Sequence, residues 1–137
     1  MSSWKDIAHF THEGADSGTV DFGQAVRLLA QAGCDGYAVD FRRGRRTYYM
    51  PDGDTLELDT TPASGPVAAD FDVARVRAAI RSAQQNAPGY TYRGFCEQVT
   101  AAGCAGYLVS LPGRRVLYFG RTAETHTEYF PAAPAAP

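Results

Sequence analysis

The chain has 137 residues, with 13 lysines and arginines against 15 aspartates and glutamates, and a net charge of −2. This length predicts a single domain, residues 1–137, whose core needs neither a disulfide nor a metal. The slightly acidic balance argues against a general nucleic-acid binder, and no apolar run reaches the roughly 18 residues of a membrane span. We expect no export signal, so the three cysteines should be reduced in a cytoplasmic protein.

The chain contains an internal repeat. Residues 32–39 read AGCDGYAV and residues 102–109 read AGCAGYLV, an offset of 70. Further on, Gly44-Arg45-Arg46 matches Gly113-Arg114-Arg115 if one residue is deleted from the second copy. Two copies are too few for a solenoid. The repeat therefore predicts one domain built from two similar halves that are related by a pseudo-twofold axis.

Two helices are predicted before the first copy of the repeat. Ser3 begins the first helix with a capping-box pattern, and Gly14 is expected to end it. Asp21 begins the second helix, whose apolar positions recur at helical spacing. Gly33 follows as the left-handed residue that ends this helix.

The second half repeats this pattern. Asp70 or Asp72 begins a helix, and a segment rich in Asn, Pro and Gly at 86–89 ends it. Thr91 begins the next helix, and Gly103 ends it. Asp21 and Thr91 are equivalent in the repeat and both are good N-cap residues, which supports the alignment.

Alternating apolar and polar residues predict three strands after each pair of helices. The expected strands are 36–41, 47–50 and 55–59, then 106–111, 116–119 and 124–130. The order of helix, helix, strand, strand and strand thus occurs twice. It predicts an α+β fold with an antiparallel sheet and helices packed on it. The halves are 1–59 and 70–130, joined by a linker at 60–69 and followed by a mobile Pro/Ala tail at 131–137.

The strongest candidate for chemistry is the segment 124–128, ETHTE. On a strand, Glu124, His126 and Glu128 share one face. A histidine between two carboxylates can act as a general acid or base, with a carboxylate orienting its ring. The alternative is a solvated edge strand with ordinary charge pairing.

Two further histidines, His9 and His12, share one face of the first helix. Together with His126 and Glu128 they would supply four metal ligands. Nothing in the sequence brings that helix to that strand, and a helical HxxH often faces water. We therefore predict no metal site.

Tyrosines and arginines are the remaining candidates. Eight tyrosines fall on or beside the repeat elements, where they would either line a cleft or pack in the core. The basic run 41–46 suits phosphate or carboxylate, but it is also typical of a solvated turn. Arg121 would either pair with Glu124 or bind an anionic substrate.

The cysteines are interpreted as small buried hydrophobic residues. Cys34 and Cys104 are equivalent in the repeat, and a catalytic thiol would not normally occur twice. Cys96 takes the place of Val26 in the first half, which also favours burial.

The second half also carries a family resemblance. Its motifs are AGCxGY at 102–107, GxRxxYxGR at 113–121 and HxExFP at 126–131. They resemble an uncharacterised bacterial family labelled phage envelope protein-like, a YbcV-like domain of unknown function. The resemblance extends over about 22–131 and implies no established activity. Since the first half lacks the GR and HxE motifs, we expect any site in the second half.

These observations predict a ligand cleft near the junction of the halves, in an enzyme or binder of small molecules. An enzyme would use acid–base chemistry, such as isomerisation, dehydration or cyclisation. His126 would be the acid or base, Glu128 would orient it, and Tyr118 would donate to an oxyanion. The substrate would be bound by Arg121, Glu124 and Arg115.

No phosphate loop, CxxC pair or dinucleotide fingerprint is present, so no cofactor is predicted. The first alternative is a non-catalytic interaction protein, phage- or stress-related, with a flat apolar patch. The second is a nucleic-acid module that uses the arginine hairpins, which the net charge disfavours. The sequence does not indicate an oligomeric state.

Overall fold

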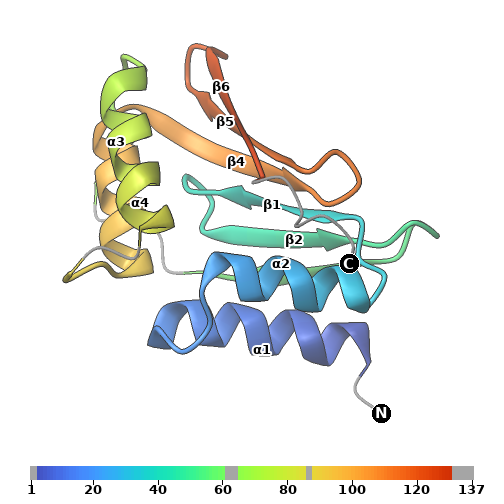
Figure 1. Ribbon diagram of the computed structural model, residues 1–137. Coiled ribbons are helices and arrows are strands. Elements are labelled where there is room, and N and C mark those ends of the chain that lie inside the picture. Colours follow the sequence, from blue (N-terminus) through green and yellow to red (C-terminus); the bar gives the residue numbers. More distant parts are fainter. Residues whose placement is uncertain (1–2, 61–64, 86–87, 131–137) are drawn as a thin grey trace.

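The computed structural model describes residues 3–60, 65–85 and 88–130, which form four helices and one six-stranded antiparallel sheet (Figure 1). This is the α+β class that the sequence predicts. The first half contains α1 (Trp4–Ser17), α2 (Phe22–Gln31), β1 (Gly36–Asp40), β2 (Arg45–Tyr49) and β3 (Thr55–Asp59). The second half contains α3 (Val73–Gln84), α4 (Tyr92–Ala101), β4 (Cys104–Ser110), β5 (Arg115–Gly120) and β6 (Thr125–Tyr129).

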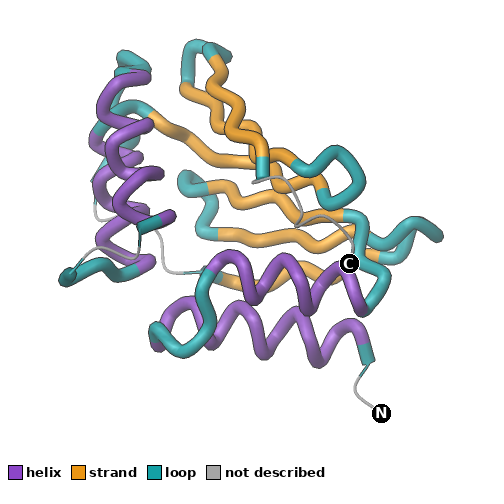
Figure 2. Tube along the Cα trace, viewed as in Figure 1, coloured by secondary structure: helices purple, strands orange, loops and turns teal. Residues whose placement is uncertain are grey.

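The strands follow the order β3-β2-β1-β4-β5-β6, so β1 and β4 meet at the centre and β3 and β6 form the edges. Figure 2 shows the helices as two pairs, α1 with α2 and α3 with α4. Both pairs pack on the same face of the sheet: the Tyr48 hydroxyl donates to the carbonyl of Ala8 in α1, and Tyr107 bonds Tyr92 of α4. None of the four helices in the described part of the chain packs on the opposite face of the sheet.

The N-caps lie where the sequence predicts them. The side chain of Ser3 accepts from the Asp6 backbone, and Asp21 accepts from Gln24. The same bonds begin α3 at Asp72 and α4 at Thr91. Each side-chain acceptor satisfies a backbone N–H that the first helical turn leaves unpaired.

The predicted end of the first helix at Gly14 is wrong. Helix α1 continues to Ser17 and ends at Gly18, which has the left-handed φ of 79°. The physical reason is close packing, because a Cβ on Gly14 would collide with the side chain of Val20. Gly14 is small so that the chain after the helix can fold back against it.

The one-residue deletion in the repeat is also wrong. Tyr37 faces Tyr48 across β1 and β2, and the pair 70 residues on, Tyr107 and Tyr118, face each other across β4 and β5. In the second hairpin Arg114, rather than Gly113, has the positive φ, and Arg114 lies 70 residues after the left-handed Gly44. The offset of 70 thus continues through both hairpins. That the halves superpose about a twofold axis stays a prediction.

The described part of the predicted linker is packed against the domain. Val67 is buried, and the N–H of Ala68 donates to the carbonyl of Thr100 at 3.0 Å. Residues 61–64 and the predicted mobile tail, 131–137, lie outside the described residues.

Two repeat-equivalent glycines give a matched test of this packing. Gly33 and Gly103 both have positive φ, but a Cβ on Gly33 meets only the flexible tip of Met50, whereas a Cβ on Gly103 collides with the backbone of Asp70. We expect Gly33→Ala to lower the free energy of unfolding by about 1–2 kcal/mol from left-handed strain alone. Gly103→Ala should cost at least about twice as much in urea denaturation. Equal losses of unfolding free energy in the two variants would show that the close contact with Asp70 does not contribute to the cost.

Candidate functional site

The structure brings His126 and Glu128 together on edge strand β6. The Nε2 atom of His126 lies 3.1 Å from Oε2 of Glu128, and the two side chains are 17% and 29% exposed. Because a carboxylate only accepts, Nε2 of His126 donates this hydrogen bond. In the neutral ring, Nδ1 therefore has the free lone pair.

Tyr118 is adjacent to this pair. It lies directly across from His126 in the register of β5 and β6, so both side chains project from the helix-covered face. Burial raises the pKa of the Tyr118 phenol far above its ordinary value, so the phenol stays protonated and can donate. Among the described residues, no group forms a hydrogen bond with the Tyr118 hydroxyl, which leaves it available to a ligand.

The residues that correspond to His126 and Glu128 in the first half, 70 positions earlier in the chain, are apolar. Leu56 faces Tyr48 in β3 just as His126 faces Tyr118 in β6, and Leu58 precedes Glu128 by the same interval. Both leucines pack against the core. The sheet edge therefore forms with leucines at these positions, and its geometry does not itself require a histidine and a glutamate.

The structure gives no contact between the Glu124 side chain and His126 among the described residues. Glu124 lies in the turn before β6, is exposed, and accepts a hydrogen bond from the Thr122 hydroxyl at 2.7 Å. Only Glu128, of the two predicted carboxylates, contacts the histidine ring. The predicted pairing of Arg121 with Glu124 is absent among the described ion pairs. Arg121 Nη1 donates instead to the carbonyl of Val67 at 3.2 Å.

Arg115 lies on the other face of the sheet. It faces Tyr129 in the register, its guanidinium lies 4.7 Å from the Tyr129 ring centroid, and its Nε donates to the carbonyl of Gly113. Strand alternation separates this side chain from Tyr118 and His126. Of the six predicted site residues, the structure thus brings three together: His126, Glu128 and Tyr118.

The histidines of α1 do not approach His126. The buried His12 lies beside β3, where its Nε2 donates to the carbonyl of Asp59 at 3.2 Å, and β3 is the opposite edge from β6. His9 is exposed. Among the described residues, no group of three or more His, Cys, Asp or Glu side chains is arranged to hold a metal ion.

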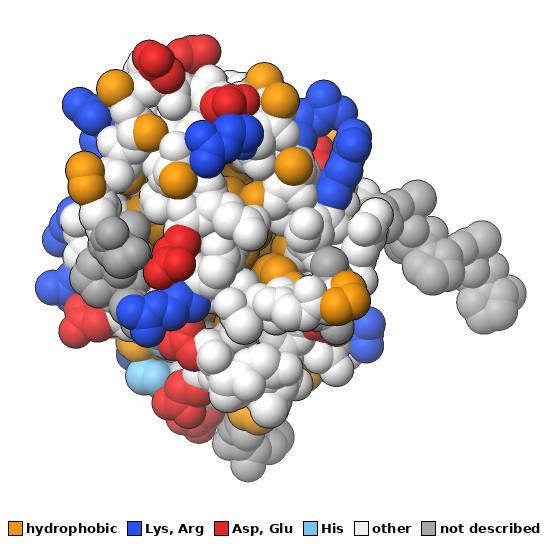
Figure 3. Space-filling view, turned by 90° about the vertical axis from the view of Figure 1, so that its left-hand side faces the viewer, with side chains coloured by type: hydrophobic (Ala, Val, Ile, Leu, Met, Phe, Trp, Pro, Cys, Tyr) orange, Lys and Arg blue, Asp and Glu red, His pale blue; other side chains and the backbone are white. Residues whose placement is uncertain are grey.

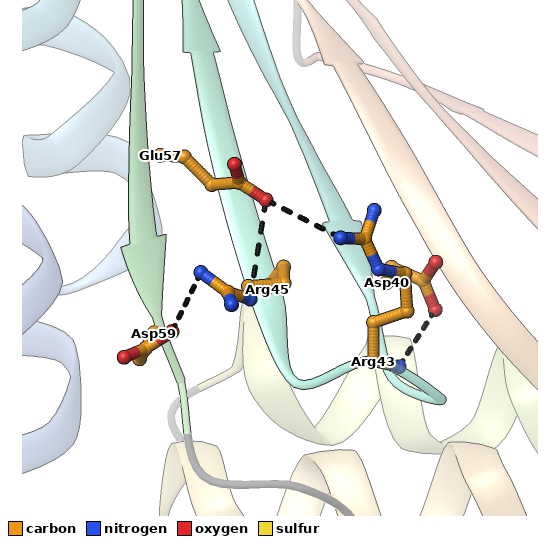
Figure 4. Close-up of polar contacts among 5 residues, drawn as sticks. All are labelled: Asp40, Arg43, Arg45, Glu57 and Asp59. Carbon is orange, nitrogen blue, oxygen red and sulfur yellow. Dashed lines mark hydrogen bonds and ion pairs between the residues drawn. The ribbon is translucent and has the colours of Figure 1, made fainter.

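The basic run at 41–46 does not form a free cationic patch. Figure 4 shows Arg45 between Asp59, at 2.9 Å, and Glu57, at 4.0 Å. Arg43 lies 3.9 Å from Glu57, and its backbone N–H donates to Asp40. These exposed pairs contribute little stability, but they neutralise the charge of the hairpin.

Arg46 departs from the solvated-turn interpretation, because it is only 4% exposed. Its side chain lies on the core face, between Tyr37 of β1, Tyr92 of α4 and Tyr107 of β4. Sequence reasoning missed it by treating the arginines as one run. Strand alternation was the available signal, since Arg46 and the apolar Tyr48 are two residues apart.

The cysteine interpretation agrees with the structure. All three cysteines are free, with Cys34 and Cys104 buried and Cys96 half-buried. The thiols of Cys34 and Cys104 donate to the carbonyls two residues on, Gly36 and Gly106. Burial raises the pKa of Cys96 and of Cys104 to about 11, which makes both thiols poor nucleophiles.

Figure 3 shows the face that α3 and α4 present. Basic and acidic side chains are interspersed on it with hydrophobic ones, and neither sign of charge prevails there. Within the described ranges, no helix has the length and apolar character needed to cross a bilayer.

Comparison with known proteins gives no identification: no protein-family model matches the chain, and no curated protein matches it. The resemblance to the phage envelope protein-like family stays a prediction.

His12 predicts a pH dependence of stability. Burial and the charge of Arg46 lower its pKa below the ordinary 6.5, against smaller opposing effects of Asp16, the Asp59 carbonyl and Glu13. The unfolded chain therefore takes up the proton first, so stability is constant above about pH 7 and falls as the pH drops below about 6.5.

Urea unfolding measured from about pH 8 to pH 5 tests this dependence. Below about pH 6.5, the free energy of unfolding should fall with a slope approaching about 1.4 kcal/mol per pH unit. We expect His12→Gln, which can still donate to Asp59, to weaken the slope. His9→Gln, on the exposed side of the same helix, serves as the matched control. An unchanged slope in His12→Gln would contradict the assignment.

The thiols predict slow alkylation of the native protein. With a pKa of about 11 at Cys96 and Cys104, roughly one thiol in a thousand is ionised at about pH 8. We expect iodoacetamide to label these cysteines slowly in buffer and all three rapidly in urea, as read by intact mass. Native labelling of Cys104 at the rate of the unfolded chain would contradict its burial.

Proposed function

We propose that the protein binds a small molecule at the helix-covered edge formed by β5 and β6 and acts on it by acid–base chemistry. The observation that supports this most is the contact of 3.1 Å between His126 and Glu128, with Tyr118 across from the ring. The first half has leucines at the corresponding positions, so the polar pair is not explained by packing.

In this proposal Nδ1 of His126 takes a proton from the substrate. Glu128 accepts from Nε2, which fixes the tautomer and stabilises the imidazolium that forms. The Tyr118 phenol donates to the oxygen on which negative charge develops. This arrangement suits abstraction of a proton next to a carbonyl, the step shared by many isomerases, dehydratases and cyclases. It requires no cofactor.

Arg121, Glu124 and Arg115 are not retained as substrate ligands. Their side chains are bonded to Val67, Thr122 and Tyr129 respectively, and Arg115 projects from the opposite face. We also propose a cytoplasmic location, supported by three free cysteines. The pairing of the hairpin arginines with carboxylates supports a partner other than nucleic acid.

A second candidate is a non-catalytic interaction protein of the phage-related kind that the sequence resembles. The helix-free face of the sheet favours it, because three large residues on that face are well exposed: Tyr49, Leu108 and Tyr129, at 40%, 44% and 64%. Exposed apolar and aromatic side chains of this kind are typical of partner contacts. This face lies opposite the His126 site, so the two candidates predict different sensitive residues.

Deuterium uptake from D₂O into pyruvate, acetone and dihydroxyacetone, followed by NMR, tests the acid–base proposal. We expect the wild-type protein to accelerate uptake into at least one probe, and His126→Ala to reduce this rate at least about 100-fold. The unfolding free energy of His126→Ala should stay within about 1 kcal/mol of the wild type. Thr127→Ala, on the same strand and the opposite face, is the matched control.

Exchange no faster than in buffer, or exchange that persists in His126→Ala, would rule out the proposed acid–base site. Loss of a partner contact in Leu108→Asp, with His126→Ala unaffected, would favour the interaction protein instead.

A further inference from the structure

A second cluster of polar side chains lies inside the domain, around Arg46. The inference drawn from this cluster is independent of the function proposed for His126. Arg46 is 4% exposed, and no described carboxylate lies within ion-pair distance of it. Buried arginines are normally paired, because transferring a guanidinium out of water is costly unless an opposite charge accompanies it. The charge of Arg46 has no such partner in the described chain.

The groups around Arg46 are neutral. Its Nη2 donates to the Tyr92 hydroxyl at 2.7 Å, and its guanidinium lies 5.0 Å and 5.3 Å from the ring centroids of Tyr37 and Tyr92. Burial raises the pKa of Tyr37, Tyr92 and Tyr107 well above the ordinary phenol value. These hydroxyls stay protonated. Those of Tyr92 and Tyr107 accept from the guanidinium, and the ring of Tyr37 lies against it, but none of them neutralises its charge.

An unsatisfied hydrogen-bond donor occurs at Arg46 itself. Among the described residues, the Nε–H of Arg46 is a buried donor without a hydrogen-bond partner. Nδ1 of His12 also lacks a partner, but it is an acceptor, because Nε2 of this ring donates to Asp59, so it does not contribute to an anion site. An N–H aimed at no acceptor beside an unbalanced positive charge is the complement of a small anion.

The surrounding elements favour an anion as well. Tyr92 is the first residue of α4, so the positive end of this helix adds to the field at Arg46. Tyr92 and Cys96 are only half-buried, so this layer of α4 separates Arg46 from solvent.

We propose that Arg46 binds the carboxylate of a small monocarboxylic acid. The planar guanidinium matches a carboxylate through its Nε and Nη hydrogens. One negative charge balances Arg46, whereas a dianion such as phosphate leaves a net charge buried. The rings of Tyr37, Tyr92 and Tyr107 suit an apolar or aromatic acid.

The second half shows that the fold does not need this arginine. Val116 lies 70 residues after Arg46 and is equally buried, and Phe22 lies 70 residues before Tyr92. The corresponding position is thus apolar, and the sheet there forms without a guanidinium. The hydroxyls of Tyr92 and Tyr107 also bond to each other at 2.7 Å, so we expect both to retain a partner in a variant without Arg46.

Thermal unfolding with benzoate, acetate, benzamide or chloride at matched ionic strength tests the proposal. We expect benzoate or acetate to raise the midpoint of the wild-type protein above that in chloride, and neutral benzamide to have no such effect. Arg46→Met should lose at least about 100-fold in affinity, because it removes a charged pair of hydrogen bonds. Arg45→Met, at the exposed neighbouring position, should bind as the wild type does.

The wild-type protein gives an independent reading that needs no variant to fold. The ¹⁵N signal of Arg46 Nε–H, assigned by its absence in Arg46→Lys, should shift as benzoate is added. The proposal is wrong if carboxylates stabilise no more than chloride, or if they stabilise Arg46→Met equally. It is also wrong if the protein is stabilised while the Nε–H signal stays in place.

Discussion

The pairing of β1 with β4 is the contact on which the rest of the structure depends. It joins two three-stranded halves into one sheet and gives the four helices a common face to cover. The strands approach closely because of two glycines 70 residues apart. A Cβ on Gly36 would collide with the carbonyl of Val109, and a Cβ on Gly106 with that of Val39. Any larger residue would push the halves apart, and the shared core of tyrosines would open with them.

Local chemistry made much of the fold predictable. The caps at Asp21 and Thr91 and the left-handed glycines at 33 and 103 depend on neighbours a few residues away, so the sequence shows them directly. The end of α1 was mispredicted because Gly14 serves a contact with Val20 instead of a turn, and that contact exists only once the chain has folded back. The hairpin deletion was mispredicted because Arg114 adopts a φ that normally favours glycine.

In the candidate site, too, the features set by neighbours in sequence were predictable and those set by tertiary contacts were not. Spacing along one strand placed His126 and Glu128 on a common face, and Tyr118 came from the family motif. The substrate roles of Arg121 and Glu124 depended on tertiary contacts that spacing does not encode, and both side chains are bonded elsewhere. The buried position of Arg46 was not predicted, because its neighbours in sequence differ in character from its neighbours in space. Its neighbours in sequence are exposed arginines, and its neighbours in space, Tyr92 and Tyr107, come from the other half.

The internal repeat allows each polar residue, His126 and Arg46, to be compared with its apolar counterpart in the other half. Where the halves share a residue, as at Tyr37 and Tyr107, the simplest reason is that the sheet needs it there. Where one half has a leucine and the other His126, or one a valine and the other Arg46, the same backbone position accepts both. Burying a charged or titratable group at such a position costs stability that the apolar residue does not. The two departures lie on different strands, in different halves, and on the same helix-covered face. Requirements of packing do not explain them, whereas the two proposed binding sites would.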